Sequence, residues 1–383
     1  MRTRTRRAAR FRLAVLVLGC AVCGGICLRL CERQEIGSPW QRTGVLGFAF
    51  AVDPQAAGRT LVHWMDEAAS VPAVLPPEIP PELPAQQVQT GPPKEDTPAG
   101  QADASAQTPP PADRIPADWL AVREVAYPET GAGERYIPLS AGSVRNLTSY
   151  SAQQLRETVA QGGLPFAVTP DSAEPQVLIL HTHATECYAE ADGWVSPYNN
   201  GRTTDTAANM VAVGAELAAV LNAAGICTVQ DTALHDHPSY NGSYGRSRAA
   251  TEQWLAAYPS IKVVLDVHRD AIETDGVRIK PTAVINGQKA AQLMIISGAD
   301  DGTMGMPAFW QNLRFAAALQ AAVEESCDGL TRPVLFDYRN YNQQLTTGSL
   351  LLEIGGHGNT LEEAKYTARL VGQVLAQLLR DNA

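Results

Sequence analysis

Ionisable side chains directly follow three short apolar runs of the sequence, and together they could carry out hydrolytic chemistry. The runs cover residues 177–180, 263–265 and 350–352, and each has the composition of a strand buried on both faces. Buried ionisable groups carry a large free-energy penalty unless they are paired or bind a metal. Since the carboxyl ends of parallel strands meet at one edge of a sheet, we expect the three clusters to converge.

The residue types in these clusters are those of a catalytic zinc site. Two imidazoles, one carboxylate and an open position for water form a common zinc shell, and a separate carboxylate then moves the water's proton. We assign one Zn²⁺ per chain to His181, Glu186 and His268, and the general base and acid role to Glu353.

Two of these ligand assignments leave an alternative open. In an extended chain His181 and His183 point to the same face, so either imidazole could bind the metal, and we favour His181. Glu186 could instead be an ordinary loop carboxylate. In that case Asp205, at the start of the next expected helix, would supply the third ligand.

Four further residues have expected roles around the metal. Zinc-bound imidazoles normally need partners that orient them, so we expect Asp266 and Asp270 to position His268. Arg269 could bind a substrate carboxylate through two hydrogen bonds, and a structural salt bridge is the alternative. His357 lies in a glycine-rich turn that permits close backbone approach to a ligand.

The elements that must position these residues alternate between strand and helix from about residue 176 onward. This order is typical of an α/β domain with a mostly parallel, twisted sheet and helices on both faces. The expected strands cover 177–180, 226–229, 261–267, 282–285, 293–297, 333–336 and 349–354, and the expected helices cover 206–224, 247–258, 307–325 and 361–379.

The N-terminal region has the pattern of an exported, anchored protein. Residues 1–12 contain six arginines and no acid, and the sixteen residues 13–28 carry no charge. We expect a cytoplasmic basic tail at 1–12, a single transmembrane helix at 13–31, and a catalytic domain outside the cytoplasm. A cleaved or lipidated signal peptide is the alternative, and it also exports the domain.

A proline-rich segment separates this anchor from the domain. Residues 71–111 hold 12 of the 26 prolines, and this composition predicts that 32–112 form a disordered linker before a catalytic domain at 113–383. Without the arginines of the tail, 24 basic residues face 40 acidic ones, which argues against nucleic-acid binding. The sequence also lacks the H-E-x-x-H, G-x-S-x-G and phosphate-loop motifs.

Four segments in order, 177–186, 239–248, 265–271 and 352–364, resemble the stage II sporulation protein P family. The resemblance spans roughly residues 140–380. It implies an N-acetylmuramoyl-L-alanine amidase with possible endopeptidase activity on stem-peptide crosslinks. It also implies a place in the sporulation septum on the mother-cell side, where the family thins peptidoglycan and supports engulfment with stage II sporulation proteins D and M.

The domain is also similar to the broader zinc amidase class, whose ligands are His, Glu and His with a glutamate on a late strand. That similarity supports His181, His268 and Glu353. It supports Glu186 less well, because the ligand glutamate of that class lies near the start of the first helix. A two-metal hydrolase and a septal scaffold without activity are the rival hypotheses.

Overall fold

The computed structural model describes residues 115–383. The tail, the anchor and the linker predicted for 1–12, 13–31 and 32–112 therefore lie outside the described residues, and those predictions stand as made. Within 115–383, no helix combines the length and the apolar character needed to cross a membrane.

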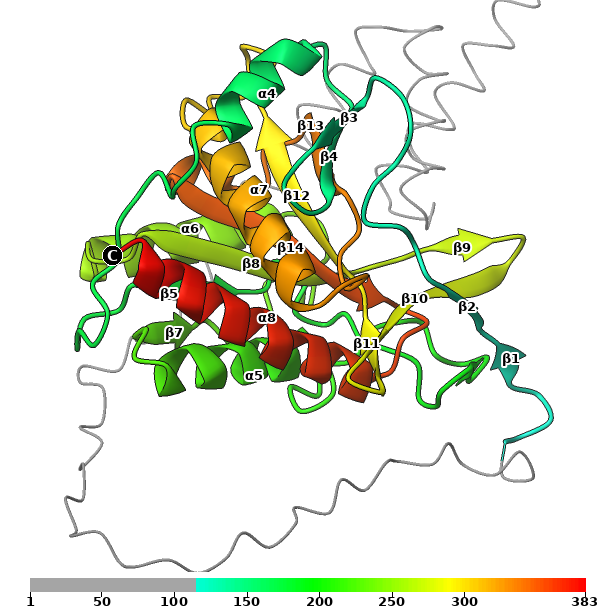
Figure 1. Ribbon diagram of the computed structural model, residues 1–383. Helices are drawn as coiled ribbons and strands as arrows, with labels where there is room; N and C mark the ends of the chain where they lie inside the picture. Colours follow the sequence, from blue (N-terminus) through cyan, green and yellow to red (C-terminus); the bar gives the residue numbers. More distant parts are fainter. Residues whose placement is uncertain (1–114) are drawn as a thin grey trace, which may run out of the picture. The chain divides into compact units, whose positions relative to one another are not determined.

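The described chain folds around an eight-stranded mixed sheet (Figure 1). Five of its seven neighbouring pairs are parallel, and the strand pairs β3–β4 and β12–β14 are antiparallel. In spatial order the strands are β3 (Tyr136–Pro138), β4 (Ser143–Asn146), β13 (Val334–Tyr338), β12 (Leu293–Ala299), β14 (Gly348–Gly356), β8 (Val263–Asp270), β5 (Val177–Leu180) and β7 (Thr228–Gln230).

The sheet is mostly parallel, as we expected, but β12 runs antiparallel to β14. No crossover helix joins β8 to β12. The chain instead makes a hairpin of β10 (Val277–Ile285) and β11 (Gln288–Ala291). Asn286 and Gly287 form its two-residue turn with φ of 51° and 78°, the backbone that hairpin turns prefer. The short strands β2 (Arg123–Val125) and β9 (Glu273–Thr274) pair with β10 of this hairpin. Two more short strands, β1 (Leu120–Ala121) and β6 (Trp194–Val195), pair with each other.

Helices cover both faces of the sheet, as expected. On one face the large core packs against helices α4 (Ala152–Val159), α5 (Met210–Ala223), α7 (Phe309–Ser326) and α8 (Leu361–Asp381). On the other face a smaller core packs against α6 (Ser243–Ala257). Successive side chains of β5 point to opposite faces of the sheet, so this strand contributes to both cores. Ile179 belongs to the large core, and Leu178 and Leu180 belong to the small one.

The expected helices are all present, but α5 starts at Met210 and not at 206. The Asn209 side chain accepts a hydrogen bond from the backbone N–H of Val211 and caps α5, and Gly225 follows that helix with φ of 78°. Thr360 and Glu363 form a capping box at the start of α8. α6 begins at Ser243, four residues before the expected start, and this earlier start puts Tyr244 and Ser247 on a helix.

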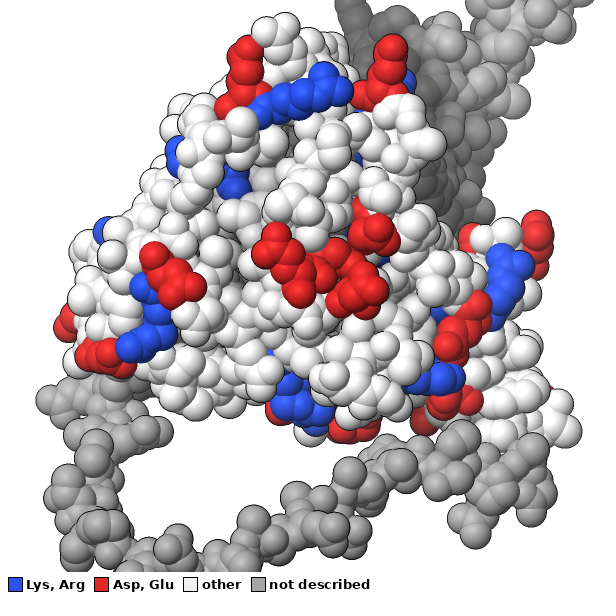
Figure 2. All heavy atoms as spheres, viewed as in Figure 1, with Lys and Arg blue, Asp and Glu red and all other residues white. Residues whose placement is uncertain are grey.

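Charged side chains are interspersed on the face of the domain seen in Figure 2, with a group of acidic side chains near its centre. That face has no broad basic area, in line with the acidic composition. It therefore lacks the electrostatic footprint of a nucleic-acid-binding surface.

Candidate metal centre

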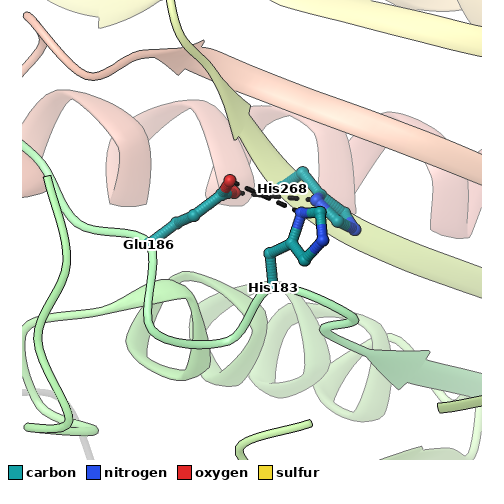
Figure 3. Close-up of side chains that lie close together, drawn as sticks. All are labelled: His183, Glu186 and His268. Carbon is teal, nitrogen blue, oxygen red and sulfur yellow. Dashed lines mark ion pairs between the residues drawn. The ribbon is translucent and has the colours of Figure 1, made fainter. Parts of the chain in front are cut away.

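Two histidines and a glutamate meet at the carboxyl end of β5 and β8. His183, Glu186 and His268 each offer one ligand atom, and these atoms all lie within 4.8 Å of one another. Glu186 Oε1 lies 3.6 Å from Nδ1 of His183, and Oε2 lies 3.6 Å from Nδ1 of His268 (Figure 3). Segments 82 residues apart in sequence therefore converge on one point.

The turn after β5 presents His183 and Glu186 together. The backbone N–H of Glu186 donates to the carbonyl of His183 at 3.1 Å, which closes the turn and brings the two side chains to one side. Asp236 fixes the turn from outside, because its two carboxylate oxygens accept hydrogen bonds from the backbone N–H and the hydroxyl of Thr185 at 3.1 and 2.6 Å.

His181, which we favoured as a ligand, lies apart from this group. Leu180 pairs with Asp266 in the β5–β8 register, so His181 continues level with Val267, on the opposite face from His268. Its Nδ1 lies 2.9 Å from the Val267 carbonyl oxygen, and its Nε2 lies 2.9 Å from the amide nitrogen of Gln230. Both ring nitrogens thus have partners within the protein, and the candidate group contains His183 where we expected His181.

The alternation argument failed at this point for a physical reason. β5 ends at Leu180, and the chain turns over the following residues. The rule that residues i and i+2 share a face holds only in an extended strand, so it does not apply to His181 and His183.

Glu186 is buried and surrounded by positive charge. Arg269 donates its backbone N–H to Oε2 at 3.3 Å, and the guanidinium groups of Arg269 and Arg202 lie 3.8 and 3.6 Å from Oε1. Burial alone would raise the pKa of Glu186, but His268 and Arg269 outweigh it and lower the pKa to about 2. Glu186 is therefore an ionised carboxylate at neutral pH, as a metal ligand must be.

Asp205, the alternative third ligand, does not join the group. It is exposed, and its carboxylate accepts a hydrogen bond from the backbone N–H of Ala207 at 2.9 Å. Of the two candidate carboxylates, the structure therefore places Glu186 with the histidines.

His268 is oriented from behind by Asp266, as we expected for that aspartate. Asp266 Oδ1 lies 2.8 Å from Nε2 of His268, which leaves Nδ1 facing Glu186. Burial opposes the charge on both groups. Asp266 and Glu186 nevertheless hold the pKa of His268 well above its usual value. In turn, His268 and Thr182 hold the pKa of Asp266 below the usual value of an aspartate.

His183 lies in an aromatic environment. Its ring stacks on the half-exposed Tyr240 with centroids 4.7 Å apart and meets the Tyr244 ring edge-on at 5.4 Å. Burial and the neighbouring His268 lower the pKa of His183 to about 4, so the imidazole is neutral and able to bind a metal. Its Nε2 is buried, with no hydrogen-bond partner among residues 115–383.

Glu353 faces the same side of the sheet as His268. The two residues are register partners on the parallel strands β14 and β8. One carboxylate oxygen of Glu353, Oε2, is buried without a hydrogen-bond partner in the described part of the chain. Burial, together with the nearby carboxylates of Asp270 and Glu186, raises the pKa of Glu353 to about 8 against the opposing charge of His268.

A bulge follows Glu353 directly. The register advances three residues on β14, from Glu353 to Gly356, but only two on β8. Gly355 has φ of 68°, and a Cβ there would lie 2.6 Å from both the Cβ of Ala291 and the Asn359 side chain. Only glycine fits this conformation and space, so the glycine-rich turn serves the backbone.

The other predicted residues have structural contacts. Arg269 is buried and donates to the carbonyls of Cys187 and Gly201 at 3.0 and 2.7 Å, and its ion pair with Glu186 is the kind of structural salt bridge that we weighed against substrate binding. Asp270, expected to orient His268, instead pairs with Arg332 at 2.9 Å. The Nε2 of buried His357 lies 3.3 Å from Glu273 Oε1.

The donor set fits one zinc ion. Two imidazoles and an ionised carboxylate suit this borderline-soft cation. Asp266 holds His268 in place, and Arg269 holds Glu186. Three protein ligands leave a coordination position open for water, the arrangement of a catalytic site.

Sequence reasoning missed several residues around this centre: Thr182, Arg202, Tyr240, Tyr244 and Asn342. A signal was present for two of them, because Tyr240 and Tyr244 lie in the segment 239–248 that carries the family resemblance. Arg202 lies over the Tyr240 ring, 4.9 Å from its centroid, and no motif marks it.

Among solved structures with some likeness to this chain is an N-acetylmuramoyl-L-alanine amidase, AmiC2 of Nostoc punctiforme. It shows 14% identity and a TM-score of 0.33 over 55% of this chain and 97% of that one. Another is the CwlD amidase from Clostridioides difficile in complex with the GerS lipoprotein, with 10% identity and a TM-score of 0.35 over 54% and 99%. These values are too low to support an inference about function.

A curated relative gives a closer match. The Stage II sporulation protein P of Bacillus subtilis is 29% identical over 252 residues, which cover 62% of this chain and 58% of that protein's length. The family model of Stage II sporulation protein P matches residues 127–376, a span that contains all three members of the metal group and Glu353. This chain therefore belongs to the Stage II sporulation protein P family.

Proposed function

We propose that this protein is a zinc-dependent peptidoglycan hydrolase that cleaves the amide bond between N-acetylmuramic acid and the L-alanine of the stem peptide. The observation that carries the proposal is the convergence of His183, Glu186 and His268, with Glu353 beside His268 on the next strand. On the basis of family membership, we extend the proposal to septal peptidoglycan thinning and engulfment during sporulation. Cleavage of stem-peptide crosslinks is a second activity proposed for the same centre.

His183, Glu186 and His268 would hold the ion. When bound, zinc supplies a Lewis acid that activates water and polarises the scissile carbonyl. Glu353 would take the proton of the attacking water on its unpartnered Oε2 and hand it to the departing alanine nitrogen. A pKa of about 8 in the metal-free protein suits this double role, since a nearby cation would lower it towards neutral.

The surrounding residues would keep the ligands in place during this proton transfer. Arg269 and Arg202 hold Glu186 ionised, and Asp266 keeps Nδ1 of His268 directed at the ion. Tyr240 and Tyr244 cover the ring of His183 and limit its contact with water. Each ligand thus has its own partner, as precise metal sites require.

The proposal includes location and partners. A single anchor at 13–31 would hold the domain outside the cytoplasm on the mother-cell side of the sporulation septum. Stage II sporulation proteins D and M are the proposed partners there. Both statements come from the sequence pattern and the family, and detergent extraction and co-purification from sporulating cells test them.

The test is hydrolysis of purified, dye-labelled sacculi by the zinc-loaded protein. We expect dye release, new L-alanine amino termini equal in number to the bonds cut, and loss of both after chelation and their return with zinc. Products with intact muramoyl–alanine bonds would exclude the amidase assignment.

Metal counting separates the rival hypotheses. Elemental analysis should find one zinc per chain, and a His183→Ala variant should retain far less. Two ions per chain would favour a two-metal hydrolase. A zinc-loaded protein without any hydrolytic activity would favour the scaffold.

A further inference from the structure

The β13–β14 connection contains a strained turn beside the metal group. Tyr341 and Asn342 are consecutive non-glycine residues with φ of 45° and 58°, in the left-handed region. This backbone conformation is unfavourable for residues with a Cβ, and it persists where surrounding contacts hold it. The contacts made by this turn therefore indicate what the strain serves.

The Asn342 side chain is the first member of a hydrogen-bond chain. Its Nδ2 donates to the backbone carbonyl of Tyr244 at 2.9 Å and to Oγ of Ser247 at 3.1 Å. Oγ of Ser247 lies 2.7 Å from the hydroxyl of Thr182, and that hydroxyl lies 2.6 Å from Asp266 Oδ2. Ser247 and Thr182 are fully buried.

The direction of the protons in this chain is determined by its last acceptor. The Asp266 carboxylate can only accept, so the single hydroxyl hydrogen of Thr182 is donated to it. Ser247 must then donate to Thr182, and Asn342 donates to Ser247. All donors point the same way, which strengthens each bond through mutual polarisation.

The chain ends on a metal ligand. Asp266 also accepts the backbone N–H of Thr182 at 2.8 Å, and its Oδ1 lies 2.8 Å from Nε2 of His268. With its carboxylate fixed in this way, Asp266 forms an ion pair with His268 on the Nε2 side of the ring. The other ring nitrogen, Nδ1, faces Glu186 Oε2 at 3.6 Å, on the side where the proposed ion would lie.

The same turn also supports the other histidine. The Tyr341 ring stacks on Tyr244 with centroids 5.3 Å apart, and Tyr244 meets the ring of His183. Arg339 donates to the Tyr341 hydroxyl at 2.7 Å and holds that ring from outside. One turn thus reaches both imidazoles of the metal group, one through hydrogen bonds and one through packing.

We infer that Asn342 is a positioning residue for the metal centre, acting through Ser247, Thr182 and Asp266 to fix the tautomer and orientation of His268. The inference rests on the proposed zinc site and extends it to a loop 74 residues from His268 in sequence. The strain at Asn342 is then the cost of aiming its amide at α6 and the buried chain.

Zinc affinity tests the inference without any need for hydrolytic activity. Asn342→Gly keeps the left-handed backbone and removes the amide, and Asn286→Gly makes the same change in the β10–β11 turn, away from the chain. Competition against a chromophoric chelator should show zinc binding about 10-fold weaker for Asn342→Gly, within the range for loss of an outer partner, and unchanged for Asn286→Gly.

A second pair of variants probes the middle of the chain. Thr182→Val removes the hydroxyl and should weaken zinc binding about 10–100-fold, whereas Thr182→Ser restores the donor and should bind nearly as the wild type does. Nitrogen NMR of the zinc-loaded protein should find the single ring hydrogen of His268 on Nε2 in the wild type, and a mixture of the two ring positions in Asn342→Gly.

The outcomes separate two failures. A wild-type protein that binds no zinc would overturn the proposed centre and this inference with it. A wild type that binds zinc, with Asn342→Gly within twofold of it and an unchanged His268 tautomer, would overturn the inference alone. If Asn342→Gly does not fold, Asn342→Asp, which turns the donor into an acceptor in the same backbone conformation, gives the same test.

Discussion

Glu353 and His268 are register partners on adjacent parallel strands, and the β14 bulge begins directly after Glu353. The pairing puts a carboxylate beside an imidazole of the candidate metal group, on one face of the sheet, without making it a member of that group. A proton-transfer residue needs this relationship, near the ion but not bound to it.

Glu353→Gln should abolish catalysis and spare the metal. The amide has nearly the same shape but cannot accept the proton of water, so we expect activity on labelled sacculi to fall about 10²–10⁴-fold. Zinc content and the far-ultraviolet circular dichroism spectrum should match the wild type. Activity within threefold of the wild type would remove Glu353 from the mechanism.

The two histidines after β5 should behave differently when each is replaced. His183→Gln removes a proposed ligand and should weaken zinc binding by more than the roughly 10–100-fold typical of an outer partner. His181→Gln removes a buried ring that contacts Val267 and Gln230, so it should lower thermal stability and leave zinc affinity closer to that of the wild type. The reverse order of zinc affinities, measured by chelator competition, would restore His181 as the ligand.

The metal-free protein should show a pH signature of Glu353 in its stability. The folded-state pKa of about 8 lies above the usual value of 4.5, so the stabilising contribution of Glu353 is complete below about pH 4.5 and is lost as pH rises through 8. The stability of Glu353→Gln relative to the wild type should therefore increase between these values, by about 1.4 kcal/mol per pH unit at its steepest.

Urea unfolding of both proteins across this pH range measures the difference. The effects of His183, Glu186 and other titrating groups are shared by the two chains and largely cancel. A difference in unfolding free energy that stays flat from pH 5 to 8 would contradict the raised pKa.

Gly355→Ala should destabilise the fold more than an alanine at an open turn. Both Gly355 and Gly287 have positive φ, but a Cβ meets nothing within 4 Å at Gly287 and lies 2.6 Å from Ala291 at Gly355. Each alanine adds backbone strain of about 1–2 kcal/mol, and only Gly355→Ala adds a clash. Equal urea midpoints for the two variants would show that the bulge absorbs the extra atom without cost.

Much of the architecture was readable from the sequence because composition and periodicity act locally. The apolar run at 177–180 predicted β5 with its observed bounds, and the expected end of the helix at 224 agrees with the observed end of α5, although α5 begins at Met210 and not at 206. The direction of β12 was not readable, since it depends on the hairpin that replaces a crossover helix.

The candidate site, like the fold, was predictable from the sequence only in part. The sequence by itself determined which residue types end the buried strands, and hence that imidazoles and carboxylates gather at one edge of the sheet. Alternation also determined which residues share a face within each strand. It could not say which face of β5 coincides with the face of β8 that carries His268.

Only the tertiary structure decided this, through the pairing of Leu180 with Asp266. That register places His181 behind the sheet, and the turn that follows brings His183 to Glu186 and His268. Asn342 reaches the same centre through contacts between distant segments. Register and loop packing depend on interactions between segments far apart in the chain, so local sequence patterns do not determine them.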